Sequence, residues 1–253
     1  WCVMGNAHLG GVVYMKAIAR YGSPCFDVVG TISTHVFAGG EGKWCNGVTA
    51  LAKIARKFPH TAYVGLARSL QFEWQCLQRV VPGAEAHFQP VEDAIVQHFL
   101  PALLGETDPI NDTVRAQIGL PVKEGGIGIP SPLATAKPMF KASAQATAPL
   151  VDSLKTGAPL DVLPFTIDAK KARSRSRKER EAASKVIRED LITKVSNKQR
   201  IVLSYAGETG HWLTTLPTVF NSTDLSKEEF QDNIRIRLGL PPNSMPKTCN
   251  GCG

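Results

Sequence analysis

Prolines and glycines divide residues 44–105 into three stretches, and in each stretch apolar residues recur every three or four positions. The clearest stretch follows Pro59 and ends at Pro82-Gly83. Its apolar residues are Ala62, Leu66, Leu70, Trp74, Leu77 and Val81. This spacing puts them on one face of an α-helix, because the helix has 3.6 residues per turn. A chain with this pattern is expected to fold by packing helices on one another.

The stretches on either side show the same period. The first stops at Pro59, and the third starts at Pro90, which suits the first turn of a helix, and ends at Gly105. Their apolar faces are Val48, Leu51, Ile54 and Ala55, and Val91, Ile95, Phe99 and Leu103. Three antiparallel helices joined by short loops predict a small helical bundle.

The rest of the chain predicts a mainly α fold with a second helical lobe. In the Gly-rich segment 120–130, Gly125-Gly126 indicates a tight turn between short extended pieces. Residues 157–168 contain two prolines and predict a linker. We therefore expect a helical domain over 46–156, the linker over 157–168 and a C-terminal helical lobe over 169–253. Residues 1–45 are Gly-rich, show no clear period and stay unassigned.

The last helix has the best-defined ends. Ser226 and Glu229 have the spacing of a capping box, in which each side chain bonds the backbone of the other residue. Leu225 and Phe230 stand where a hydrophobic staple needs them. Gly239 is expected to end the helix.

Nearly all of the net charge of +7 comes from one short segment. Its cations are Lys170, Lys171, Arg173, Arg175, Arg177, Lys178 and Arg180. The single acid among them is Glu179, so the segment carries +6. Clustered Lys and Arg are sufficient to bind the phosphates of RNA or DNA. The same composition is typical of a nuclear-import signal, or of a solvated helix face without a partner.

Two serines interrupt the basic segment. Ser174 and Ser176 alternate with arginines. Phosphorylation of both would add about −3 to −4 of charge and cancel much of the patch. The sequence therefore allows regulation of the segment by phosphate.

The cysteines are too few and too scattered for a secreted disulfide framework. We expect a reducing compartment, the cytoplasm or the nucleus. Cys249 and Cys252 have the spacing of a zinc-binding pair, but a structural zinc site needs four ligands and only Gly253 follows. The pair thus predicts a truncated zinc motif, with no cofactor in this chain and zinc only in a longer parent. No apolar run is long enough for a membrane span, so no membrane partner is expected.

A further pattern lies in the order of short strings between residues 43 and 253. The strings are Lys43-Trp44, Leu51-Ala-Lys-Ile-Ala55, Pro59, Ala62-Tyr63, Ser69-Leu70, Glu73-Trp74, Arg79-Val-Val-Pro82, Phe99-Leu-Pro-Ala-Leu103, Leu120-Pro-Val-Lys-Glu-Gly-Gly-Ile-Gly-Ile129, Ala142-Ser143, Trp212-Leu-Thr-Thr-Leu-Pro217, Glu229-Phe230 and the terminal Cys-Asn-Gly-Cys-Gly. In this order they resemble the region downstream of the polymerase core in non-LTR (LINE-like) retrotransposon reverse transcriptases.

The resemblance implies that residues 46–156 form a thumb-like domain beside a template–primer. It also implies an upstream polymerase core in the parent chain, which would be an RNA-directed DNA polymerase. Arg68 and Arg79, away from the apolar stripe of their helix, would then lie along the backbone of RNA or DNA. Without the resemblance, they are simply exposed polar residues.

One departure from the family bears on activity. Such polymerases hold two metal ions with palm aspartates that include an adjacent Asp-Asp pair, whereas no two aspartates are adjacent here. The expected function is therefore non-catalytic contact with nucleic acid by a fragment of the parent enzyme. Two alternatives stay open, a degenerate retroelement relic without a selected role and a helical protein-interaction adaptor with a basic nuclear-import arm.

Overall fold

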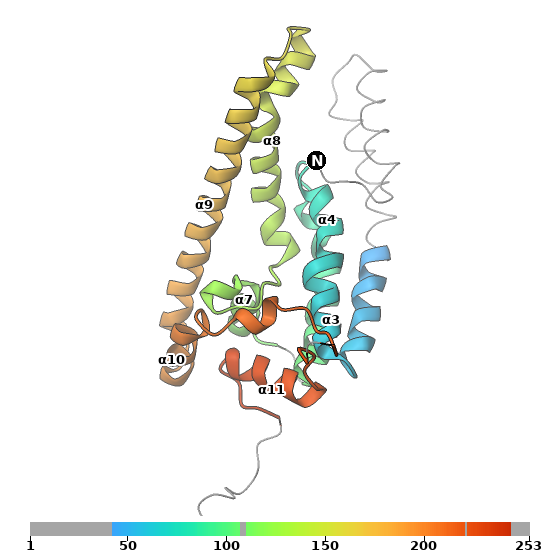
Figure 1. The fold of residues 1–253 in the computed structure, drawn as a ribbon, viewed down its shortest axis with the longest axis vertical. Coiled ribbons are helices and arrows are strands. Elements are labelled where there is room, and N and C mark those ends of the chain that lie inside the picture. Colours follow the sequence, from blue (N-terminus) through green and yellow to red (C-terminus); the bar gives the residue numbers. More distant parts are fainter. Residues whose placement is uncertain (1–41, 107–109, 221, 244–253) are drawn as a thin grey trace, which may run out of the picture.

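The computed structural model describes residues 42–106, 110–220 and 222–243, and these residues form helices and loops without a β-strand (Figure 1). The prediction of a mainly α fold is confirmed. Residues 1–41, which hold most of the unassigned N-terminal segment, lie outside the described ranges. Among the described residues, no helix is both long and apolar enough to cross a membrane.

The three helices expected from the apolar period are present. The first covers residues 42–55. The second is continuous through α3 (Pro59–Gly65), a π-helical turn η1 (Leu66–Leu70) and α4 (Gln71–Gln78). The third follows a 3-10 turn, η2 (Glu85–Phe88), and runs through α5 (Gln89–Ala94), a π-helical turn η3 (Ile95–Phe99) and α6 (Leu100–Leu104).

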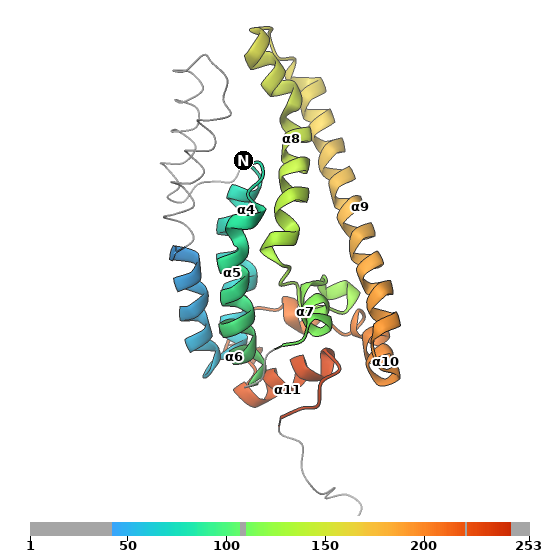
Figure 2. The same ribbon diagram turned by 180° about the vertical axis from the view of Figure 1, so that it is seen from behind.

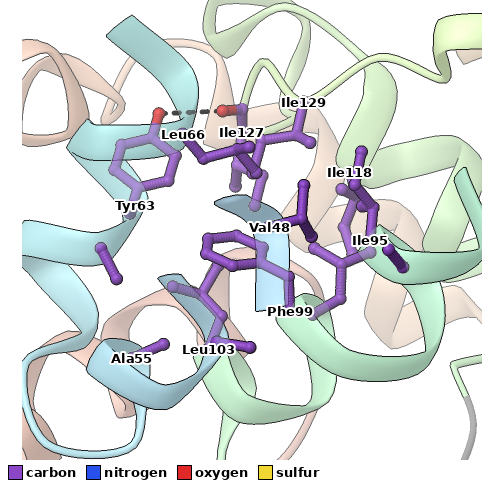
Figure 3. Close-up of a cluster of buried hydrophobic side chains, with 14 of the residues drawn as sticks. Val48, Ala55, Tyr63, Leu66, Ile95, Phe99, Leu103, Ile118, Ile127 and Ile129 are labelled. Carbon is purple, nitrogen blue, oxygen red and sulfur yellow. Dashed lines mark hydrogen bonds between the residues drawn. The ribbon is translucent and has the colours of Figure 1, made fainter. Parts of the chain in front are cut away.

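The apolar faces of these helices meet in one core (Figure 3). Leu66, Phe99 and Leu103 are fully buried in it. Trp74, on the apolar face of the second helix, is buried and meets Trp44 edge to face, with ring centroids 6.5 Å apart. Trp44 also stacks on Phe88 at 6.1 Å. Burial of these large side chains supplies the main stabilisation of the bundle, at about 1.5–3 kcal/mol for each.

The Gly-rich segment closes over this core after α7 (Asp112–Gly119). It forms a 3-10 turn, η4 (Val122–Glu124), after which Gly125 adopts φ +89°. A Cβ on Gly126 would lie 2.1 Å from the carbonyl oxygen of Leu120, so only glycine fits there. Ile127 and Ile129 then enter the core, and the Tyr63 hydroxyl donates to the Ile127 carbonyl oxygen at 2.8 Å (Figure 3).

Two long helices project from the bundle as a hairpin. They are α8 (Pro132–Thr156) and α9 (Val162–Lys194), and they pack on each other. Gly157 ends α8 with φ +69°. The expected linker, 157–168, therefore contains a short connection and the first turns of α9 rather than a long flexible segment.

The chain returns to the bundle through α10 (Asn197–Ala206), a 3-10 turn η5 (His211–Thr214) and α11 (Lys227–Arg237). The capping box of Ser226 and Glu229 is present as predicted. Phe230, Ile234 and Leu238 are buried in the same core as the first three helices. The boundary expected at 157–168 thus does not separate two cores, because α11 packs against α3 and α6.

Candidate nucleic-acid interface

The basic segment lies in the first half of α9, on an edge of the molecule. Only Ala169 and Leu191 are buried in this 33-residue helix. In Figures 1 and 2, α9 forms the outermost edge of the fold, with α8 between it and α4. The tertiary structure therefore holds a largely polar helix where a large partner can reach it.

All seven cations of the segment are exposed. Lys171 lies 3.4 Å from the Asp168 carboxylate, an exposed contact that contributes little to stability. Within the described ranges, the other six form no ion pair. These cations are therefore available to an anionic partner, and only Arg177 among the six also acts on the Glu181 carboxyl.

Helical geometry sorts the seven cations into two stripes. The first stripe is Lys170, Arg173, Arg177 and Arg180, and the second is Lys171, Arg175 and Lys178. Each stripe falls within an arc of about 60–80°, and the two arcs are centred about 150° apart around the helix. The cations consequently flank α9 on two sides instead of forming a single face.

Small side chains occupy the side of α9 that packs on α8. Ala169 is buried, and Ala172 and Ser176 are half-buried. These small residues let the two helices approach closely without enclosing the cations. Because α9 has no large apolar face of its own in this region, its position depends on α8.

An exposed ion pair connects α9, just after the basic segment, to the bundle. The ammonium of Lys123, in η4, lies 2.8 Å from a Glu181 carboxylate oxygen. This hydrogen bond and charge, with smaller effects of Arg177 and Lys185, lower the pKa of the Glu181 carboxyl. The Glu181 carboxyl is therefore ionised at neutral pH and paired with Lys123. The sequence reading missed this pair because its partners are far apart in the chain.

The structure does not bring Arg68 and Arg79 to the basic segment. Both are exposed, on η1 and just after α4, and α8 lies between these elements and α9 in both views (Figures 1 and 2). The Arg68 guanidinium donates to the carbonyl oxygen of Thr214 and so helps to hold η5. The residues predicted to bind nucleic acid therefore lie in two separate places. The group on α9 carries far more charge than Arg68 and Arg79.

The predicted zinc pair, Cys249 and Cys252, lies outside the described residues. Within the described ranges, no three His, Cys, Asp or Glu side chains are arranged to hold a metal ion. The zinc motif therefore stays a prediction from sequence alone.

A shallow groove of 480 Å³ lies between α10 and α11. Its walls include the exposed side chains of Ile201, Tyr205 and Ile236. Arg237, the one charged residue among its lining, is engaged with backbone carbonyl groups. The lining residues therefore offer apolar contact surface, and the charged surface of α9 is the stronger candidate site.

Comparison with known proteins finds no matching family model, curated protein or solved structure. Function is therefore inferred from the arrangement of the side chains.

Proposed function

We propose that the chain is a non-catalytic nucleic-acid-binding module of a retroelement reverse transcriptase, acting in the cytoplasm or nucleus beside the polymerase core of its parent. The assignment to a reverse transcriptase follows from the sequence resemblance. Nucleic-acid binding has independent support from the charge and exposure of α9.

The observation that carries the proposal is the cluster of seven exposed cations on one projecting helix. Phosphate contacts made by Lys and Arg release condensed counterions from the nucleic acid. This counterion release supplies most of the free energy of sequence-independent binding. A stretch of about 15 Å of helix axis separates Lys170 from Arg180, enough to meet several phosphates. Binding is therefore expected to depend on backbone charge.

The test is fluorescence anisotropy with labelled RNA and DNA single strands at three salt concentrations. If four or five cations touch phosphates, log affinity should fall with log salt with a slope of about −3. The variant Arg173→Gln, Arg175→Gln, Arg177→Gln, Arg180→Gln should bind at least tenfold more weakly at moderate salt, with a smaller slope. Glutamine keeps a similar helix propensity, so circular dichroism should be unchanged.

A matched control removes four exposed cations elsewhere. Its substitutions are Lys155→Gln, Lys198→Gln, Arg200→Gln and Lys227→Gln. The control lowers the net charge equally, so it should keep most of the affinity if α9 is the site. Equal losses in both variants would indicate non-specific attraction to the whole protein. An unchanged slope in the α9 variant would move the site to Arg68 and Arg79, and no binding at low salt would favour the adaptor or the relic.

A further inference from the structure

His60, the second residue of α3, is buried between the bundle and the N-terminal end of α11. Its side chain is 3% exposed. The ring stacks on Phe230 of α11, with ring centroids 4.8 Å apart. Its Nδ1 atom accepts a hydrogen bond from the Leu225 backbone N–H, with the two nitrogens 3.4 Å apart. One side chain of α3 thus contacts both α11 and the loop that leads into it.

The two residues that His60 contacts are the members of the hydrophobic staple. In this motif a residue before the helix packs on a residue at the end of its first turn and fixes the direction in which the chain enters. Leu225 comes directly before the N-cap of α11, and Phe230 is the fourth helical residue. Phe230 also contacts Tyr63 of α3 and meets Trp212 of η5 edge to face. His60 therefore helps to hold the N-terminal half of α11 on the bundle.

The C-terminal half of α11 is held by arginines instead. Arg235 lies 2.6 Å from a Glu106 carboxylate oxygen, and Arg237 donates to backbone carbonyl oxygens that include that of Gly126. Arginine stays protonated at every pH near neutral. A loss of the His60 contacts would consequently loosen one end of α11 and leave the other end attached.

The buried site suits a neutral ring and has no acceptor for a second proton. Because Nδ1 accepts from the Leu225 N–H, the single ring proton lies on Nε2. The Nε2 atom is buried, and within the described part of the chain it has no hydrogen-bond partner. A second proton would go to Nδ1 and face the Leu225 N–H. The ring would then carry a positive charge and two unpaired donors away from water, which is unfavourable.

The charged groups around the ring compensate little of this cost. Asp224, in the loop before α11, attracts the protonated ring, but burial has the larger effect and lowers the pKa of His60. Asp224 is exposed, so the ring meets it best by moving toward solvent. The other charged or titratable residues on the neighbouring segments are exposed as well, and they are Arg56, Lys57, His211, Lys227, Glu228 and Glu229.

We propose that His60 is a pH-sensitive latch on the N-terminal half of α11. The neutral ring holds both staple residues, and the latch is closed. A ring that gains a proton leaves its site toward Asp224 and water, and the hydrogen bond from Leu225 breaks. The loop before α11 and the first turn of the helix then separate from α3, which exposes Phe230 and the aromatic side chains around it as an apolar surface. The latch uses none of the cations of α9 and is independent of the proposed nucleic-acid binding.

Acidification is expected to open the latch. An unperturbed histidine has a pKa of 6.5, and burial lowers the pKa of His60 in the closed state. The open state therefore takes up the proton first, so the closed state is favoured most above about pH 7.5 and is weakened as pH falls through 6.5. The open fraction should rise about tenfold from pH 7.5 to pH 5.5, because the open ring is then protonated about ten to one.

Hydrogen exchange of the full chain at these two pH values, corrected for the intrinsic exchange rates, tests the proposal. Protection of the backbone amides at 224–231 should fall about tenfold at pH 5.5, whereas that of α5 and α6 in the same core should change less than about twofold. Equal losses in both regions would indicate general acid destabilisation and overturn the latch. Unchanged protection at 224–231 would overturn it as well.

Two variants assign the pH response to one ring. His60→Asn keeps an acceptor near the position of Nδ1 but cannot titrate, so its protection at 224–231 should not depend on pH. The matched control His211→Asn removes an exposed histidine from η5 and should keep the tenfold change. A response that survives in His60→Asn contradicts the proposal. If that variant does not fold, an NMR titration of His60 in the parent chain decides the question, since a pKa at or above 6.5 would rule out the latch.

Discussion

Tyr63 ties the first half of the bundle to the Gly-rich segment. Its ring is buried in the core, and its hydroxyl donates to the Ile127 carbonyl oxygen. Burial raises the pKa of the phenol to about 12, an effect that the nearby positive charges of Arg237 and Arg68 only partly oppose. The hydroxyl thus stays protonated in the folded chain at pH values where an exposed tyrosine ionises.

Replacing Tyr63 with Phe tests both properties. The variant should lose about 1–2 kcal/mol of unfolding free energy, because it leaves a buried carbonyl without this donor. In the parent chain the unfolded state loses the phenolic proton near pH 10, whereas the folded state keeps it up to about pH 12. Stability should therefore fall as pH rises through that interval. Urea unfolding at pH 8, 10 and 11 should show a smaller alkaline loss in Tyr63→Phe, and an identical loss in both proteins would contradict this account.

At the scale of the elements, the C-terminal helices are held by a buried arginine and not only by apolar contacts. The Arg237 Nε group donates to the Gly126 carbonyl oxygen at 3.0 Å. Its two terminal nitrogens donate to the carbonyl oxygens of Ala206 and Val122. One guanidinium therefore joins α11 to the end of α10 and to the Gly-rich turn.

Changing Arg237 to Lys should destabilise the protein by about 2–4 kcal/mol, because an ammonium cannot reproduce the planar fork and leaves buried carbonyl oxygens unpaired. Urea unfolding followed by circular dichroism measures the loss. The matched control is Arg200→Lys on α10, where the side chain is exposed. Equal stability of the two variants would show that the buried hydrogen bonds contribute little.

On the scale of the whole molecule, the fold consists of a compact bundle with a projecting arm. The core joins residues from the first helix, at 42–55, to α11 near the C-terminal end of the described chain. The α8–α9 hairpin extends away from it and carries the main cluster of cations (Figure 1). This separation lets the arm engage a large ligand without rearranging the core.

The intact chain should not extend a primer. Two-metal phosphoryl transfer needs carboxylates that hold both ions, and the sequence lacks the adjacent Asp-Asp pair that the resembled polymerases use. The assay combines purified chain, primer–template, Mg²⁺ and all four deoxynucleotides. Extension that survives repurification and disappears with EDTA would contradict the non-catalytic assignment.

The sequence by itself determined the local structure and the location of the charge. The apolar periods at residues 44–105 predicted three helices, and Ser226 with Glu229 predicted the start of α11. Both patterns depend on residues one or two helical turns apart, so they can be recognised without knowing the fold. The clustering of cations between Lys170 and Arg180 is likewise a property of composition.

Only the tertiary structure decided which elements share a core. Phe230 enters the core beside Tyr63, and Arg237 reaches Gly126, across separations that no local pattern encodes. The prolines at 157–168 predicted a domain boundary. In the structure a short turn there joins α8 to α9, and the parts of the chain before and after this hairpin pack into one core. Long-range packing makes these choices, because burial depends on the partners that the folded chain brings together.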